Sequence, residues 1–268
     1  MKKPYFYFSE VQSAGQLRQL FKLRYRTYQS SRLRGFLEEN KHEMDLDGYD
    51  LRSRHFGLFE AGEGAADPVG HLRVIQDHDG PNRERVLRVA RETGFDPAML
   101  EQAPSEPFPL ILFHKDDRVL QHLYRGCRER GASLVEASRL CIAAPVASPE
   151  LMAFVMHSAM AIYLLVLGCD YAMMACSPNH TPFYRIAGWR KFPNVPPFDI
   201  HGVRLIPMMI TRTQIAAPLA PTVELMAQAY RETGRICFYP HSRGHFLPPD
   251  EQEPGSLKAD QFAMPPIE

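Results

Sequence analysis

Residues 135–143 have the sequence VEASRLCIA, in which the apolar residues of a buried β-strand are interrupted by charge. Val135 and Ile142 are typical of a strand inside a sheet. Glu136 and Arg139 lie between them, and a buried ion costs several kcal/mol unless it is paired. The segment therefore predicts a core strand whose charged side chains have either structural partners or a chemical task.

The spacing of these two charges adds a geometric constraint. Residues 136 and 139 are three positions apart, so a regular strand would direct their side chains to opposite faces of the sheet. A β-bulge between them would bring both side chains to one face. We therefore expect either a bulge near Ala137–Ser138 or separate partners for Glu136 and Arg139.

Strands and helices alternate around this segment. Runs of β-forming residues predict strands at 55–61, 69–77, 135–143, 169–177 and 203–212. Apolar residues at helical spacing predict helices at 9–32, 83–92, 116–131, 149–167, 180–188 and 221–234. This order favours an α/β fold with a sheet of mixed direction and helices on both faces. We expect a main domain over residues 1–214 and a C-terminal extension over 215–268, made of one helix and an irregular tail.

The composition limits the class of protein. The 268 residues include 31 Lys plus Arg and 31 Asp plus Glu, so the net charge is zero and no global basic field favours nucleic acid. The five cysteines form no CxxC pair, which predicts reduced thiols in a cytoplasmic protein. The start, MKKPYFYFSE, has no signal-peptide pattern, and the histidines form no HExxH pattern that would predict a metal site.

The most apolar stretch is LMAFVMHSAMAIYLLVLG, residues 151–168. It is slightly shorter than a membrane span and contains His157 and Ser158. We therefore expect a buried helix, with Ser148 as its N-cap and Pro149 at its first position.

Other charged residues also fall where buried structure is predicted. They are Arg24 in the first helix, Arg73 in a strand, and Asp45, Asp47 and Asp50 in an acidic connection. Because unpaired buried charges are unfavourable, we expect these residues to meet Glu136 and Arg139. Two interpretations are open: a structural ion-pair network, or an active site in which one carboxylate is free to act as a base.

A second polar segment, SPNHTPFYRIAGW, covers residues 177–189. Asn179 follows a predicted strand end, which is where α/β folds place ligands. Tyr184 lies on the short helix that follows. It is either a proton donor to a leaving group or a core residue.

Four segments in this order resemble a known family: LRYRTYQ, DLDGYD, GHLRVI and EASRLCIA. They resemble the acyl-homoserine-lactone synthases and the long-chain N-acyl amino acid synthases, which belong to the GCN5-related N-acyltransferase (GNAT) superfamily. NHTPFYRIAGW is similar to the closing segment of that superfamily. The resemblance covers roughly residues 15–212. It implies a GNAT-like, mostly antiparallel central sheet with a splayed central strand, and an acyltransferase domain over residues 1–214.

The resemblance implies a role for each matching residue. Glu136, its pKa raised by burial, would deprotonate the acceptor amine. Arg139 would order the site, and Tyr184 is the candidate acid. The other candidates would bind substrate or order the site: Arg24, Asp47, Asp50, Arg73, Ser138 and Asn179. No metal is implied, and no cofactor would be permanently bound, because an acyl-phosphopantetheine thioester would be the co-substrate.

Two departures from the family pattern bear on the substrates. Phe36 stands where the lactone synthases have a Trp, which argues against S-adenosylmethionine as the acceptor. The loop APVASPE after the central strand lacks the glycines that hold the pyrophosphate of coenzyme A. Acyl carrier protein is therefore the expected donor. The basic stretch Lys22–Arg34 either suits that acidic partner or is only a solvated helix face.

The expected function is transfer of a fatty acyl group from acyl carrier protein, or from acyl-coenzyme A, to the amine of an amino acid. The apolar helix at 151–167 would then wall an acyl tunnel or pack as plain core. Two alternatives stay open: autoinducer synthesis from S-adenosylmethionine, and non-catalytic binding of acyl chains or carrier protein. We expect no nucleic-acid partner and at most a peripheral membrane association through the product.

Overall fold

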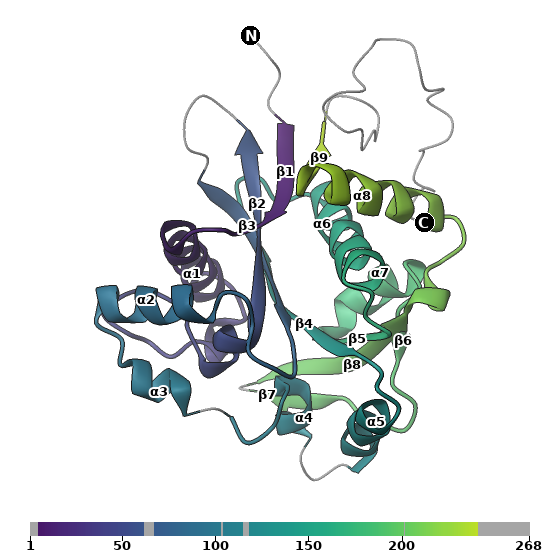
Figure 1. Ribbon diagram of the computed structural model, residues 1–268, viewed down its shortest axis with the longest axis horizontal. Helices are drawn as coiled ribbons and strands as arrows, with labels where there is room; N and C mark the ends of the chain where they lie inside the picture. Colours follow the sequence, from purple (N-terminus) through teal and green to yellow (C-terminus); the bar gives the residue numbers. More distant parts are fainter. Residues whose placement is uncertain (1–4, 62–66, 103, 115–117, 201, 241–268) are drawn as a thin grey trace.

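The computed structural model describes residues 5–61, 67–102, 104–114, 118–200 and 202–240. Their strands form a nine-stranded sheet in the order β6-β8-β5-β4-β3-β2-β1-β9, with β7 paired to β8 off this path (Figure 1). The strands are β1 (Tyr5–Glu10), β2 (Ser53–Ala61), β3 (Pro68–Ile75), β4 (Leu134–Ile142), β5 (Tyr171–Cys176), β6 (Arg190–Lys191), β7 (Phe198–Ile200), β8 (Val203–Thr211) and β9 (Arg235–Phe238).

Helices cover both faces of this sheet (Figure 1). They are α1 (Ala14–Gln29), α2 (Arg83–Thr93), α3 (Pro97–Glu101), α4 (Pro109–Phe113), α5 (Arg118–Glu129), α6 (Pro149–Met160), α7 (Thr181–Ile186) and α8 (Ala220–Thr233). The short helical turns are η1 (Arg34–Phe36), η2 (Gly48–Arg52), η3 (Ala161–Val166), η4 (Pro178–His180) and η5 (Arg212–Gln214). Helices α6 and α8 share one apolar core with Phe8 of β1, whereas α1 and α2 share another core against which its neighbour Tyr7 packs. Because successive strand residues point to opposite faces, these two cores lie on opposite sides of the sheet.

The strand directions confirm the expected fold class. Each strand pair along the sheet is antiparallel except β4–β5, which is parallel. That parallel pairing joins only Leu134–Glu136 to Tyr171–Met173. Beyond it, β4 runs on to Ile142 and β5 to Cys176 without pairing to each other, so the central strand is splayed as expected.

A bulge interrupts β4 one residue later than predicted. His71 of β3 pairs with Cys141, and Arg73 pairs with Ser138, so β4 carries one extra residue in this interval. Arg139 takes up the extra length in a left-handed conformation, with φ of 55°. The bulge brings the Arg139 side chain to the face that Arg73 and Ser138 occupy.

The start of the chain differs from the prediction of one helix over residues 9–32. The alternating aromatic residues of Tyr5–Glu10 form the strand β1, and α1 begins only at Ala14. Ser13 is the N-cap, and its hydroxyl accepts a hydrogen bond from the backbone N–H of Gln16.

The end of the chain also differs. Helix α8 lies beyond the expected domain boundary at residue 214, yet its Val223 and Met226 belong to the same core as α6. Strand β9, which we expected to be irregular, pairs with β1. The described part of the extension is therefore packed into the main sheet. The rest of the predicted irregular tail, residues 241–268, lies outside the described residues.

Helix α6 has the predicted start, because Ser148 caps it and Pro149 is its first residue. It continues into a π-helical turn, η3, in which the N–H of Leu167 bonds to the carbonyl of Ile162 at 2.8 Å. Residues Pro149–Val166 are long and apolar enough to span a membrane, but 72% of this window is buried inside the molecule. It is packed as a core helix beside α8 (Figure 1).

Candidate active site

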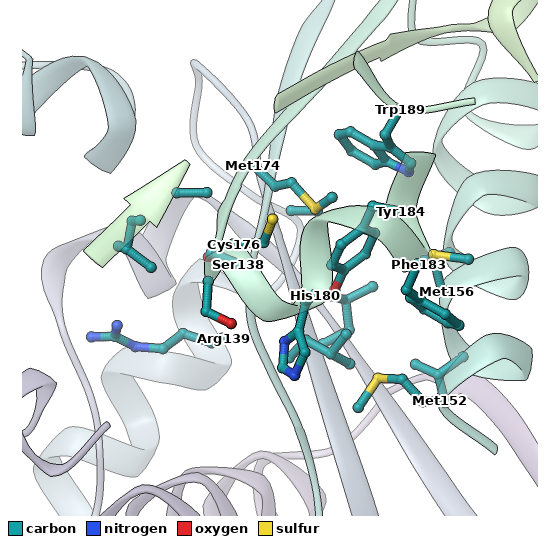
Figure 2. A pocket seen from close by; sticks show the side chains of 18 of the residues that line it. Ser138, Arg139, Met152, Met156, Met174, Cys176, His180, Phe183, Tyr184 and Trp189 are labelled. Atoms are coloured by element: carbon teal, nitrogen blue, oxygen red, sulfur yellow. The ribbon is translucent and has the colours of Figure 1, made fainter. Parts of the chain in front are cut away.

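An apolar cavity of about 440 Å³ occupies the gap between the splayed strands. Ala137 and Leu140 of β4 and Met174 of β5 form part of its wall. The opposite wall is a stripe along one face of α6, at helical spacing, that includes Met152, Met156 and Ala159. Figure 2 shows the side chains of Met156, Met174, Tyr184 and Trp189 converging on this cavity.

The cavity has an open end and a closed end. Arg32, Pro149 and His180 line it and are exposed, so they mark the mouth. Tyr163 and Trp189 line it and are only 1% and 2% exposed, so they mark the floor. Positions 149 and 163 are fourteen residues apart along the helix, which corresponds to about 20 Å at a rise of about 1.5 Å per residue. The cavity is therefore deep enough for a long alkyl chain.

A second, smaller pocket of about 130 Å³ adjoins the first. Glu136 and Arg73 line it, and so do several apolar side chains: Leu33, Phe36, Pro109, Leu110, Phe113, Phe198, Ile200 and Leu205. Residues 137–139 of β4 line both hollows, so the two meet at the point where β4 leaves β5.

Glu136 is buried beside this junction, with 4% of its surface exposed. Its Oε2 atom accepts a hydrogen bond from the backbone N–H of Leu110 at 2.9 Å. Burial raises the pKa of Glu136 to about 7, although the Leu110 N–H and the charges of Arg73 and Arg139 act in the opposite direction. A carboxyl group with a pKa near neutrality exchanges protons readily at the pH of the cell.

The predicted meeting of the other charges is confirmed. Arg24 is fully buried, and its guanidinium holds Asp50 with two hydrogen bonds of 2.9 and 3.0 Å. Its Nε atom binds Asp45 at 2.7 Å. Burial alone would raise the pKa of Asp50, but Arg24 and Arg73 outweigh it and hold that pKa well below its usual range. This part of the cluster is a structural ion-pair network.

Arg73 and Arg139 connect the network to the pockets. Arg73 binds Asp47 at 2.6 Å and Asp50 at 3.1 Å through Nη1, and its Nε donates to the Ser138 hydroxyl at 3.0 Å. Arg139 ion-pairs with Asp47 at 3.5 Å. It also lies 3.0 Å from Asp45. The aspartates therefore fix the two guanidinium groups that face the pockets.

The structure separates the sequence candidates into groups. Glu136, Arg139, Arg73 and Ser138 line the smaller pocket, and Tyr184 lines the apolar cavity. Arg24, Asp47 and Asp50 line neither hollow. Asn179 is exposed on η4 and also lines neither.

Tyr184 lies on α7 and is almost fully buried. Burial raises the pKa of its phenol, so the hydroxyl stays protonated at neutral pH. In Figure 2 this hydroxyl projects toward the side of the cavity where His180 lies.

Sequence reasoning missed two features of the site. The N–H of Leu110 comes from α4, a helix that we did not predict. Tyr28 lines both hollows, and the Arg139 guanidinium lies 5.8 Å from its ring centre. Tyr28 is four residues after Arg24 on the same helix face, which is a signal that the sequence did contain.

Comparison with known proteins identifies relatives. A family model for the N-acyl amino acid synthase FeeM matches residues 115–210. No curated protein sequence matches the chain. The structure of FeeM, an N-acyl amino acid synthase from uncultured soil microbes, is similar with a TM-score of 0.51 and 17% identity, covering 82% of this chain and 98% of that one. The CoA-dependent acyl-homoserine lactone synthase BjaI, solved with SAM and isopentyl-CoA, gives 0.50 and 15%, covering 81% and 87%.

At these identities the structural matches establish a shared fold. The chain has the fold that FeeM and BjaI share, and residues 115–210 are similar to the family model for the N-acyl amino acid synthase FeeM. The matched segment includes β4 and β5, the two strands that splay apart.

Proposed function

We propose that this enzyme moves a fatty acyl group from the phosphopantetheine arm of acyl carrier protein to the amine of an amino acid. One observation carries the proposal. The buried carboxyl group of Glu136, with a pKa of about 7, faces a small pocket that adjoins a deep apolar cavity where β4 leaves β5. Such an arrangement suits an amine on one side and an acyl chain on the other.

The donor side is supported by the apolar cavity and its mouth. The alkyl chain would lie along α6, with the thioester carbon at the junction of the two hollows. The N-terminus of α6 at Pro149 carries partial positive charge, which favours the phosphate of the arm. The preceding loop has no glycines to hold a pyrophosphate, which favours carrier protein over coenzyme A.

The acceptor side is supported by the smaller pocket. Arg73 and Arg139 offer positive charge for the carboxylate of an amino acid, and Ser138 offers a hydroxyl. The rest of the lining is largely apolar, so an amino acid with an apolar side chain suits it better than a charged one. Arg24, Asp47 and Asp50 would act indirectly, by holding these guanidinium groups in place.

The chemistry follows from these positions. Glu136 takes a proton from the ammonium group, directly or through water, and the free amine attacks the thioester carbon. Beyond Met173, the backbone N–H groups on the edge of β5 that faces β4 have no partner in β4. They are available to bind the developing oxyanion. The C–S bond then breaks as the C–N amide bond forms. Tyr184 protonates the departing thiolate and recovers a proton from the second N–H proton that the nitrogen loses as the amide forms, and Glu136 releases the first proton to solvent.

The test is incubation with mixed acyl carrier protein thioesters and all amino acids, with product masses read out. We expect N-acyl amino acids from the wild type and a rate lower by about 10²–10⁴ in Glu136→Gln, the usual worth of a positioned base. A lactone product with S-adenosylmethionine would instead indicate autoinducer synthesis. Binding of the thioester without any product would indicate a non-catalytic module.

We expect the enzyme to work in the cytoplasm, with membrane contact only through its lipid-like product. The basic stretch Lys22–Arg34 is our candidate for docking the carrier protein, but not all of it is available. Arg24 is buried within the ion-pair network, and Arg34 pairs with Glu39 at 2.5 Å. Arg32 is exposed at the mouth of the apolar cavity and forms no ion pair within the described residues.

A further inference from the structure

The floor of the apolar cavity contains a polar group that an ordinary fatty acyl chain would not use. Tyr163 comes from the π-helical turn η3 and is the last lining residue on the stripe that begins at Pro149. Its side chain is 1% exposed. No hydrogen bond of its phenol hydroxyl lies within the described residues, and the Tyr184 phenol is near enough to act on its pKa.

A second donor without a partner lies beside it. The Trp189 and Tyr163 rings meet edge to face, with 6.4 Å between centroids and an angle of 77°. The indole Nε1 of Trp189 is buried and has no partner within the described part of the chain. Two polar groups of this kind therefore lie at the closed end of one cavity.

Such groups are unusual in a folded protein. A buried donor left without a partner costs about 1–3 kcal/mol, and most buried polar side-chain atoms do find a partner. A water molecule is held well only where it has two to four polar partners. Ala159, one turn before Tyr163 on the cavity stripe, offers none, so the Tyr184 phenol is the polar group of the lining that acts on Tyr163.

We propose that the floor of this cavity recognises an acyl chain that carries an oxygen function, such as a hydroxyl or keto group, near its distal end. This inference rests on the proposed function and specifies its acyl substrate. The distal oxygen accepts a hydrogen bond from the Tyr163 hydroxyl and lies within reach of the Trp189 indole. Tyr163 is thereby a specificity-determining residue, and a plain alkyl end leaves its hydroxyl unpaired.

Binding can be measured without catalysis, because Trp189 is the only tryptophan in the sequence and its fluorescence reports on the floor of the cavity. The probes are a saturated fatty acid and its counterpart of equal length with a hydroxyl on the last carbon. We expect the hydroxylated acid to bind about tenfold more tightly, which is the worth of one net hydrogen bond. Tyr163→Phe removes only the hydroxyl and should abolish this difference.

The matched control is Tyr171→Phe, since Tyr171 packs in a different core from the cavity. It should keep the tenfold preference. Equal affinity of the wild type for the two acids, or a preference that survives in Tyr163→Phe, overturns the inference.

The same pair of chains, loaded on acyl carrier protein, separates this inference from the proposed function. We expect a higher kcat/KM for the hydroxylated thioester in the wild type and no preference in Tyr163→Phe. Transfer of both chains at equal rates overturns the specificity while the proposed function stands. Absence of transfer for either chain overturns the proposed function, and the fluorescence titration then still decides the specificity.

Discussion

The Glu136 carboxyl group should make the protein less stable as the pH rises. Its pKa is about 7 in the folded protein against an ordinary 4.5, so between these values the folded state binds more protons than the unfolded state. The free energy of unfolding therefore falls as the pH rises through this window and levels off above 7. Glutamine cannot ionise, yet its side-chain oxygen can still accept the Leu110 N–H. We expect Glu136→Gln to be more stable than the wild type at pH 8 by about 3 kcal/mol.

Urea unfolding at pH 4 and pH 8 checks this prediction. The two proteins should differ little at pH 4, where the wild-type carboxyl group is protonated in both states. Glu129→Gln, at an exposed position on α5, serves as the control and should show no such change. A Glu136→Gln difference that is the same at both pH values would mean that the carboxyl group is not perturbed.

Asp50 should be the most important residue of the ion-pair network for stability. It is fully buried and binds both Arg24 and Arg73. Removing one partner of a buried pair leaves uncompensated charge, so Asp50→Asn should lower the free energy of unfolding by about 3–5 kcal/mol. Asp47→Asn should cost less, because the Asp47 side chain is 31% exposed and water replaces part of the lost interaction. Equal losses in the two variants, measured by urea unfolding, would contradict this order.

At the residue scale, the sequence predicted which charges meet but not how Glu136 is held. The pairing of Arg24 with Asp45 and Asp50 follows from the cost of burying ions, and the structure confirms it. We expected guanidinium partners for Glu136 as well, but its partner is the N–H of Leu110. That contact depends on where α4 packs, 26 residues earlier in the chain, which no local pattern specifies.

At the scale of elements, α6 sets the length of the apolar cavity. Ala159 lies on its cavity stripe, one turn before Tyr163. Ala159→Phe should fill the inner part of the cavity and shift the preferred acyl group to a shorter chain, because the new ring occupies the space of the distal carbons. The ratio of kcat/KM for long and short acyl thioesters measures this shift. Because both values come from one enzyme preparation, the ratio does not depend on the fraction of active enzyme. An unchanged ratio would place the acyl chain elsewhere.

Other elements show where local patterns are sufficient. Strand β4 and helix α6 were predicted near their true bounds, because a dense run of strand-forming residues and a clear N-cap are local signals. The bulge in β4 was predicted from the three-residue spacing of its charges and was found one residue later, at Arg139. Strands β1 and β9 were missed because each is short and pairs only with a distant segment.

At the scale of the whole molecule, zero net charge does not prevent a local basic surface. Arg32 is exposed at the mouth of the cavity, so an acidic carrier protein that delivers the chain should pass close to it. Arg32→Glu should raise the KM for acyl carrier protein thioesters several-fold, with the larger effect at low salt. The KM for the same acyl group on free pantetheine should change less.

The control for this prediction is Arg91→Glu, an exposed position at the end of α2. It changes the net charge by the same amount, so it should leave the KM for carrier protein unaltered if docking occurs at the mouth. An equal effect of the two substitutions would indicate general electrostatic attraction instead of a docking site.

The fold class could be predicted from the alternation of elements together with the resemblance of four segments to the GNAT superfamily. The limited β4–β5 pairing and the two hollows that meet there could not be located from local patterns, because they depend on registers between strands far apart in the sequence. The extent of the sheet beyond residue 214 was also missed, since β9 joins it only through β1.

The most direct test of the central claim is the pH dependence of kcat for acyl transfer at saturating amino acid. The wild-type rate should rise about tenfold per pH unit below 7 and level off above it, as Glu136 loses its proton. Glu136→Gln should be slower by about 10²–10⁴ and should lack this rise. A wild-type profile with no change of slope between about pH 5 and 8, or a Glu136→Gln rate equal to that of the wild type, would contradict the account.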